Sequence, residues 1–490
     1  MSLESLRAIV MHHGLTEPWK ESTDLAFDAM FGAAGGRYAE DSKKSLQVRA
    51  NPMEENSVPF AALIEKNEPG NGPYGGMSIA IFPVPNAPCL LTFVVGTRGL
   101  APDDRILGRP GHARKVRAIC TWLNRKHGRG KRIAWAKQDP TLDEAAPSEV
   151  VKDFPGYGEV FGRYGKELYG VFSSEDKAAV DDAVTAFMDL MIDERGGTLV
   201  TKQHKEHAKS IRAEWMKHLL PEVTSDDVQA LLHSRRFVVI QGPPGTGKSR
   251  MAEEVLGNHY GGNGKSIQFH PNTTYENFVG GLAPVAASGD SDLGFRFAPL
   301  AGHLMEAVIA ASADPTKRYL LHIDEINRAD LSKVLGEAIY LFEVKPDRKR
   351  KIDLPYEFSN YGRTFSMPEN LDVLGTMNTA DRSLAILDIA VRRRFAFVDL
   401  WPQLSVVTEH GGSVMEEAFT RLSLIFTEHA NETAFNYMPG HAYFLEKDDV
   451  AAAKQLQVTL VPLLKEYLEQ GYAAGFSEAI RSYIQWLEAL

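Results

Sequence analysis

Residues 237–249 read FVVIQGPPGTGKS, four apolar residues followed by a glycine-rich turn and a polar, helix-compatible end. The pattern predicts a buried strand, a tight loop and a helix in direct succession. Gly242, Gly245 and Gly247 allow several backbone N–H groups to converge on one point, and the N-terminus of the following helix also favours negative charge. The complete G-x-x-x-x-G-K-S spacing therefore predicts a triphosphate-binding loop in an α/β fold.

The residue types in the loop predict how it holds a nucleotide. Lys248 is expected against the outer phosphates, and the Ser249 hydroxyl is expected on Mg²⁺. The substrate would be GTP or ATP, with Mg²⁺ as the cofactor. The predicted nucleotide-binding residues of the loop are Gly242, Pro243, Pro244, Gly245, Thr246, Gly247, Lys248 and Ser249.

A second apolar segment, residues 319–325, reads YLLHIDE and ends in two carboxylates. Phosphoryl transfer needs charge neutralisation on one side and an oriented nucleophile on the other. We expect Asp324 to bind the Mg²⁺ shell together with Ser249, and Glu325 to polarise the attacking water. An Asp-Glu pair is common by itself, but behind a complete phosphate-binding loop it predicts hydrolysis.

Length and composition limit the class of protein. A chain of 490 residues with 44% hydrophobic residues can build about three domains of ~150 residues, each with a core. Cys89 and Cys120 are too few for a disulfide scaffold or a structural zinc site, which favours a reducing compartment. The sequence has no secretory leader pattern and no run of about 18 apolar residues, so we expect a cytoplasmic protein with no membrane partner.

The order of apolar and polar segments predicts four regions. We expect an α+β recognition domain over residues 1–195, a charged helical connector over 196–224 and an α/β domain over 225–400. An α-helical lid is expected over 401–490.

The first region is expected to begin with short helices over residues 1–75, without visible chemistry. Two apolar runs at 79–83 and 89–95 predict a strand pair around a proline-bounded turn. An amphipathic helix over 175–194 closes the region, and the connector is expected to act only as a spacer.

Positive charge is concentrated between Arg98 and Lys137, where twelve Lys or Arg stand against two acids in a chain of net charge −10. A helix over 113–127 is expected in its centre. Such a stretch is typical of a nucleic-acid surface. The candidate nucleic-acid contacts are Arg109, Arg114, Lys115, Arg117 and Arg125. The alternatives are a solvated face or a docking surface for the acidic remainder of the assembly.

After the phosphate-binding loop, strand and helix patterns alternate. Strands are expected at 266–269, 319–325 and 371–375, with helices over 300–311 and 330–342, which predicts a parallel sheet covered on both faces. A hairpin is expected over 349–367.

Several segments of this half resemble the AAA+ domain of McrB-type proteins, the motor subunits of modification-dependent restriction systems. They are Gln268–His270, Tyr275–Phe278, Ile323–Ala329, Met377–Ser383, Arg392–Phe395 and Pro439–Phe444, of which MNTADRS at 377–383 is the most specific. The resemblance covers about residues 225–470 and leaves 1–195 without a family.

The resemblance also implies roles for single residues. Asn378 matches the sensor between the γ-phosphate and the attacking water. Arg392 and Arg393 match an arginine finger, which stabilises transition-state charge in a neighbouring subunit.

Three further residues follow from the same pattern. Asp381 and Arg382 match a loop that organises the sensor or contacts a partner. His441 occupies the sensor position of the lid, where many AAA+ proteins use arginine.

The resemblance implies a ring-forming, hexameric nucleotide hydrolase that moves on DNA for a restriction or anti-phage system. GTP is favoured by the resemblance, although the guanine-reading Asn-Lys-x-Asp motif of small GTPases is absent. No nuclease site is visible, so cleavage is expected from a separate McrC-like nuclease subunit. Two alternatives stay open: a MoxR or dynein-related chaperone that remodels protein, and a nucleotide-gated scaffold that recruits an effector.

Overall fold

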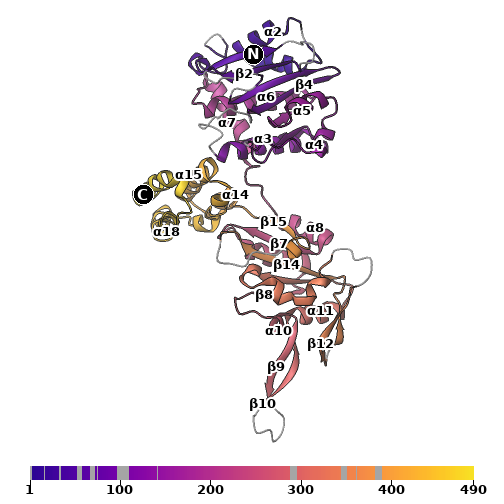
Figure 1. Cartoon of the computed structure of the whole chain (residues 1–490). Coiled ribbons are helices and arrows are strands. Elements are labelled where there is room, and N and C mark those ends of the chain that lie inside the picture. The colour runs from indigo at the N-terminus through magenta and orange to yellow at the C-terminus, as the bar shows by residue number, and fades with distance from the viewer. Residues whose placement is uncertain are drawn as a thin grey trace. The chain divides into compact units, whose positions relative to one another are not determined.

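The computed structural model has two units, each with its own core (Figure 1). Unit 1 comprises Met1–Leu220 and the short segment Ile425–Asn431, and unit 2 comprises Pro221–Leu424 and Glu432–Leu490. The structure describes residues 3–15, 17–32, 35–51, 58–66, 72–73, 76–96, 110–140, 142–286, 295–343, 350–359, 361–380 and 389–490.

Unit 1 is built on a six-stranded antiparallel sheet in the order β1-β2-β3-β4-β6-β5. Its strands are β1 (Leu46–Asn51), β2 (Phe60–Glu65), β3 (Met77–Val84), β4 (Ala87–Val95), β5 (Ala134–Ala136) and β6 (Leu168–Phe172). The predicted strand pair is confirmed as β3 and β4, joined by a turn in which Asn86 has a φ of 63°.

Helices cover both faces of this sheet, which explains why β2 and β3 are buried along their whole length. One face packs against α1 (Glu4–Met11), α2 (Trp19–Asp28), α3 (Pro110–His127), α6 (Lys177–Glu194) and α7 (Lys202–Met216). The other packs against α4 (Ser148–Asp153) and α5 (Gly158–Tyr164). Alternate strand residues face the two layers, as the pleat of a β-strand requires.

Two features of unit 1 differ from the sequence prediction. Strands β1 and β2 lie in the region expected to be helical. β1 is a mixed polar edge strand without an apolar run, and β2 is a short apolar run whose periodicity does not distinguish a strand from a helix. Helix α7 is packed into unit 1 through the buried side chains of Ile211 and Trp215, so it is part of this unit and not a free spacer.

Unit 2 contains a five-stranded sheet in the order β15-β7-β14-β11-β8, with all neighbouring pairs parallel. The strands are β7 (Phe237–Gly242), β8 (Gly264–Gln268), β11 (Tyr319–Asp324), β14 (Leu371–Asn378) and β15 (Ala396–Asp399). One face packs against α8 (Ser225–Arg235) and α9 (Lys248–Tyr260), and the other against α10 (Tyr275–Phe278), α11 (His303–Ala313) and α12 (Leu331–Leu335). The predicted parallel sheet covered on both faces is therefore confirmed.

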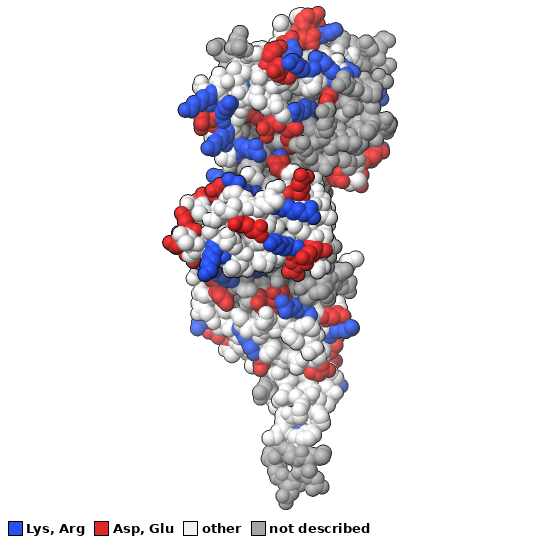
Figure 2. Space-filling model, turned by 90° about the vertical axis from the view of Figure 1, so that its left-hand side faces the viewer, with Lys and Arg blue, Asp and Glu red and all other residues white. Residues whose placement is uncertain are grey.

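Two hairpins interrupt the α/β order. The predicted hairpin is present as β12 (Ile352–Phe358) and β13 (Gly362–Phe365). A second, unpredicted one, β9 (Gly280–Ala286) and β10 (Phe295–Ala301), extends away from the sheet of unit 2, and its described surface is almost free of charge (Figures 1 and 2). The expected helix over 330–342 stops at Leu335, where Gly336 has a φ of 50°, and continues as a 3-10 turn over Gly336–Leu341.

The C-terminal region is helical, as predicted. After α13 (Ile389–Arg392) and β15 it contains α14 (Leu404–His410), α15 (Ser413–His429), α16 (Glu432–Phe435), α17 (Asp449–Gln455), α18 (Val461–Glu469) and α19 (Ser477–Glu488), with a π-helical turn at Leu456–Leu460 between α17 and α18. The C-terminal end of α15 belongs to unit 1. None of the described helices is long and apolar enough to cross a membrane.

Candidate nucleotide-hydrolysis site

The loop between β7 and α9 has the backbone conformation that its glycines allow. Gly245 and Gly247 both have a φ of 77°, in the left-handed region that side chains rarely adopt. Gly242 has a steric reason as well, because a Cβ atom there would lie 2.2 Å from the carbonyl oxygen of Leu400. The loop ends at the N-terminus of α9, where backbone N–H groups can face an anion.

Lys248, the first residue of α9, is folded back onto this loop. Its Nζ donates hydrogen bonds to the carbonyl oxygens of Gly242 at 3.1 Å and Pro243 at 2.7 Å. Burial lowers the pKa of Lys248 to about 8, against the opposing effect of Glu325 and Asp324. The ammonium group is thus held next to the loop with only neutral oxygens as hydrogen-bond partners in the described contacts.

The predicted metal ligands lie together. The Ser249 hydroxyl donates to Asp324 Oδ1 at 2.8 Å, so α9 and the end of β11 present two oxygen ligands side by side. Hard oxygen ligands of this kind, few in number and completed by phosphate oxygens and water, fit Mg²⁺. Their position at the carboxyl edge of a parallel sheet is where such folds bind ligands.

Glu325 follows directly and is held by the predicted sensor. Asn378, at the end of β14, donates from Nδ2 to Glu325 Oε1 at 2.7 Å, and Arg328 Nε lies 3.7 Å from Glu325 Oε2. Glu325 has a φ of 54°, a left-handed conformation that is rare for a residue with a side chain and is concentrated at functional sites. The arrangement places an oriented carboxylate next to the metal ligands.

A segment of the lid, Pro439–Phe444, lies on the phosphate-binding loop. Gly440 N donates to Pro244 O at 2.9 Å, and Ala442 N donates to Gly245 O at 3.0 Å. A Cβ atom on Gly440 would lie only 2.0 Å from the Gly245 carbonyl carbon, so no other residue fits this approach.

His441 is placed by that segment against the loop. Its Nε2 lies 3.3 Å from where a Cβ of Gly247 would stand, and its Nδ1 accepts from Gln403 N at 3.2 Å. Burial lowers the pKa of His441 to about 4, with Arg250 and His410 adding to the effect. His441 is therefore neutral near pH 7 and can offer nucleotide a hydrogen bond but no charge.

The three consecutive arginines differ in environment. The Arg392 guanidinium lies over the Phe397 ring at 5.3 Å, Arg394 is buried, and Arg393 is exposed without a hydrogen bond or ion pair to any described residue. Arg392 is also exposed, so both arginines predicted as fingers are accessible, and of the two only Arg392 has a ring contact with a described residue. The partner-loop residues Asp381 and Arg382 lie outside the described residues, as does Arg109 of the basic stretch.

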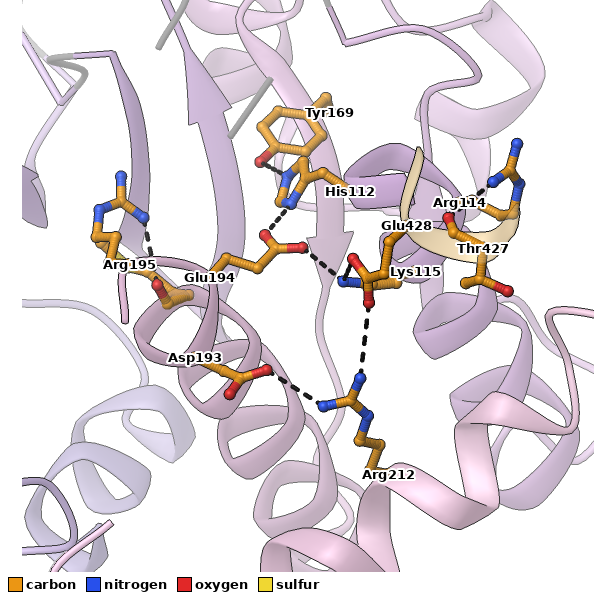
Figure 3. Close-up of polar contacts among 11 residues, drawn as sticks. His112, Arg114, Lys115, Tyr169, Asp193, Glu194, Arg195, Arg212, Thr427 and Glu428 are labelled. Atoms are coloured by element: carbon orange, nitrogen blue, oxygen red, sulfur yellow. Dashed lines mark hydrogen bonds and ion pairs between the residues drawn. The ribbon is translucent and has the colours of Figure 1, made fainter. Parts of the chain in front are cut away.

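The basic stretch requires a correction. Arg114 on α3 is 5% exposed, and its guanidinium donates to the carbonyl oxygen of Thr427 at 2.9 Å, near the end of α15 (Figure 3). It also donates to the carbonyl oxygen of Ala430 at 2.9 Å. The prediction that Arg114 contacts nucleic acid is wrong, because a cation committed to carbonyl oxygens inside unit 1 cannot reach a phosphate.

Lys115 is also buried, at 3% exposure, so the same prediction is wrong for it. Its Nζ lies between two carboxylates, Glu194 Oε1 at 3.1 Å and Glu428 Oε2 at 2.6 Å (Figure 3). His112 Nδ1 lies 2.5 Å from the other oxygen of Glu194. The pair of basic residues that seemed to face solvent thus stabilises a polar cluster in the interior of unit 1.

Three of the other described cations of the stretch are paired with acids from elsewhere in unit 1, and Lys137 donates to the carbonyl oxygens of Leu142 and Lys166. Lys126 pairs with Asp182 and Glu214, Arg132 with Asp153, and Arg129 with Asp176. On the face drawn in Figure 2, Lys and Arg side chains are interleaved with Asp and Glu instead of forming a continuous basic surface.

Two of the five residues predicted to contact nucleic acid, Arg117 and Arg125, are at least partly exposed to solvent. Arg117 is half-buried and donates to Gln138 O at 3.1 Å, and Arg125 is exposed. Arg125 and Lys131 are exposed cations of this stretch with no ion pair to a described residue.

Some residues around the hydrolytic pair escaped the sequence prediction. Thr376, Asn327 and Arg328 contact Asp324, Asn378 and Glu325, respectively. Thr376 could have been found from the strand pattern of β14. Residues two apart on a strand share a face, and Asn378, two residues later, was already predicted as the sensor.

Comparison with known proteins agrees with this geometry. The model of the AAA domain (dynein-related subfamily) matches residues 237–395. The Type IV methyl-directed restriction enzyme EcoKMcrB subunit of Escherichia coli (strain K12) is 28% identical over 351 residues, 66% of this chain and 74% of that protein. The Type II restriction enzyme BsuMI component YdiS of Bacillus subtilis (strain 168) is 30% identical over 193 residues, 32% of this chain and 55% of that protein.

A crystal structure described as a proposed ATPase from Cytophaga hutchinsonii is 16% identical, covering 53% of this chain and 69% of that one, but its TM-score of 0.25 is too low to compare folds. The strand order, the loop geometry and the two sequence relatives agree. Residues 237–395 form an AAA+ nucleoside triphosphatase domain, and this chain is similar to the McrB subunit of a restriction enzyme.

Proposed function

We propose that this chain is the nucleotide-hydrolysing motor and recognition subunit of a restriction system, in which a separate McrC-like nuclease subunit cuts DNA. The observation that carries the hydrolytic part is the 2.7 Å contact from Asn378 to Glu325, beside the Ser249–Asp324 pair. A protein that only binds nucleotide has no need of an oriented carboxylate at this point. The restriction part of the proposal is supported by the names of both sequence relatives.

In the proposed reaction, the loop amides and Lys248 bind the phosphates, while Ser249 and Asp324 hold Mg²⁺, which neutralises phosphate charge when bound. Lys248 exchanges its carbonyl partners for phosphate oxygens. Glu325, fixed by Asn378, orients the attacking water and accepts its proton.

The proposed assembly is a homo-oligomeric ring. A guanidinium supplied by a neighbour can stabilise the charge that develops on the transferred phosphoryl group. Arg392 and Arg393 are both exposed, and Arg393 is the first candidate because Arg392 lies over the Phe397 ring.

The choice between GTP and ATP rests on the McrB resemblance, which favours GTP. The test is to measure turnover of both nucleotides by the purified protein, with and without duplex DNA and the product of the adjacent gene. Preferred GTP turnover that the gene product stimulates, and DNA cleavage that needs both proteins, are expected. Turnover indifferent to both additions would contradict the restriction role.

We also propose that unit 1 binds DNA, although burial of Arg114 and Lys115 leaves few of the predicted phosphate contacts. Exposed Arg125 and Lys131 are its candidates, and each cation that neutralises a phosphate adds about one to the log–log slope of affinity against salt. Reversal of both to Glu in the full chain should weaken binding and lower that slope by about two. Lys20→Glu with Lys152→Glu changes the charge of unit 1 equally and should leave the slope unchanged; an equal effect in both double variants would show that only net charge matters.

A second candidate follows from the dynein-related description of the matching model. If the chain remodels protein instead, DNA should leave turnover unchanged and a folded protein substrate should stimulate it. The same turnover assay therefore separates the two functions.

A further inference from the structure

Thr376 is buried in the sheet of unit 2, at 1% exposure, next to the Asp324 carboxylate and the backbone of Glu325. It lies on β14, two residues before Asn378, so both side chains point to the same side of the strand. Strand β14 runs parallel to β11, with Ile323 beside Gly375, and this register brings Thr376 next to Asp324.

The hydroxyl of Thr376 uses both its donor and its acceptor capacity here. It donates its proton to Asp324 Oδ1, the oxygen that also accepts from Ser249. It accepts a hydrogen bond from the backbone N–H of Glu325 at 3.3 Å. One hydroxyl group therefore contacts the metal-binding carboxylate and the backbone of the catalytic base.

The second contact matters because of the Glu325 backbone. Its left-handed conformation, at a φ of 54°, is disfavoured for a residue with a side chain and persists only where surrounding contacts hold it. Asn378 fixes the carboxylate end of the same residue. Strand β14 thus holds Glu325 at both ends, the backbone through Thr376 and the side chain through Asn378.

We propose that Thr376 is a positioning residue for nucleotide hydrolysis, which orients Asp324 toward Mg²⁺ and keeps the Glu325 backbone in its left-handed conformation. It does not touch substrate. The inference rests on the hydrolytic part of the proposed function and names a further residue on which that function depends.

The test compares Thr376→Val, which keeps the branched shape and removes the hydroxyl, with Thr376→Ser, which keeps the hydroxyl. Removal of a group that orients a metal ligand typically costs 10- to 100-fold in metal affinity or activity. In the Val variant, kcat should fall by about that factor with little change in KM, and the Ser variant should remain within about threefold of wild type.

A binding experiment supplies a readout apart from activity. The affinity for a fluorescent, non-hydrolysable triphosphate analogue is measured in EDTA and over a Mg²⁺ titration. The Val variant should bind the analogue like wild type in EDTA, but should need about tenfold more Mg²⁺ for the tightening that wild type shows. If the Val variant does not fold, Thr376→Ala is measured in the same way.

Wild-type kcat and Mg²⁺ dependence in the Val variant would overturn the proposal. So would equal losses in the Ser and Val variants, because the methyl group and not the hydroxyl would then matter. Failure of the proposed function is a different result: the wild-type protein itself would bind nucleotide without hydrolysing it.

Discussion

Glu194 should be one of the most sensitive positions for the stability of unit 1. Its carboxylate is 3% exposed and lies between His112 and Lys115 (Figure 3). Burial alone would raise its pKa, but His112 and Lys115 outweigh burial and lower the pKa to about 2 from an ordinary 4.5. Glu194→Gln keeps the shape of the side chain and removes its charge.

The contribution of the Glu194 charge to the free energy of unfolding follows from the difference between the pKa of Glu194 in the folded and in the unfolded state. A difference of about 2.5 units at ~1.36 kcal/mol per unit contributes about 3 kcal/mol, similar to the ~3–5 kcal/mol for breaking a buried ion pair. Because the pKa of Glu194 is depressed in the folded state, the contribution is complete above pH 4.5 and is lost as the pH falls toward 2. For a domain of this size, 3 kcal/mol corresponds to a fall in Tm of about 6–12 °C at pH 7.

Thermal unfolding followed by circular dichroism and differential scanning fluorimetry measures the effect. The matched control is Asp193→Asn, the same chemical change one residue earlier, where an ion pair with Arg212 is 62% and 41% exposed on its two sides. It should change stability by less than about 1 kcal/mol. The Glu194→Gln deficit should shrink to about 1 kcal/mol at pH 3. A Tm within 2 °C of wild type at pH 7, or a deficit independent of pH, would refute the reasoning.

The remaining predictions concern unit 2. Glu325→Gln should bind nucleotide normally and lose turnover, whereas Lys248→Ala should lose nucleotide binding. Filter binding measures the first property and phosphate release the second. Near-normal hydrolysis by the Glu325→Gln variant would show that Glu325 is not the catalytic base. Mixing Arg393→Ala with Lys248→Ala subunits should restore part of the activity if the arginine acts in trans, while full activity of a strictly monomeric preparation would exclude it. Gly440→Ala should lower nucleotide affinity at least about tenfold, because its Cβ cannot fit 2.0 Å from the Gly245 carbonyl carbon and the lid segment must move; unchanged affinity and Tm would show that the segment is free to lift. Burial lowers the pKa of Lys248 to about 8, and a bound phosphate favours the charged form of this side chain. The affinity of the protein for nucleotide should therefore fall about tenfold per pH unit above 8, and calorimetry in buffers of different ionisation enthalpy should show that a proton is taken up on binding. A nucleotide affinity that does not change from pH 7 to 9.5 would refute this.

The α/β core was predictable because its signals are local. The phosphate-binding loop needs glycine at fixed positions, and buried parallel strands read as short apolar runs. Strand β1 gave no such signal, since an edge strand with polar residues such as Gln47 and Arg49 has neither an apolar run nor a clear alternation. Its place is set by pairing with β2 and by helix α2 packed over it, which are relations between segments far apart in the chain.

The roles of the basic residues were not predictable for a related reason. A count of charges along the chain records the cations of α3 but not the acids that the fold brings to them. Glu194 and Glu428 lie 79 and 313 positions from Lys115, and both reach its ammonium group. Local net charge predicts a nucleic-acid surface only where the cations stay exposed, and on α3 burial reverses the conclusion for Arg114 and Lys115.

Arg392, Arg393 and Arg394 show the same dependence on backbone geometry within three neighbouring residues. Helix α13 ends at Arg392, so the three side chains leave the backbone in different directions. Arg394 is buried, while Arg392 and Arg393 are exposed and Arg392 also lies over the Phe397 ring. If the finger acts in another subunit, it cannot be committed to its own fold, which excludes Arg394 and favours Arg393 over Arg392. Replacement of Arg394 by Ala should therefore lower stability, whereas replacement of Arg393 should lower turnover while leaving Tm and nucleotide affinity unchanged. If the two variants exchanged these effects, the finger would have to be assigned to the buried arginine.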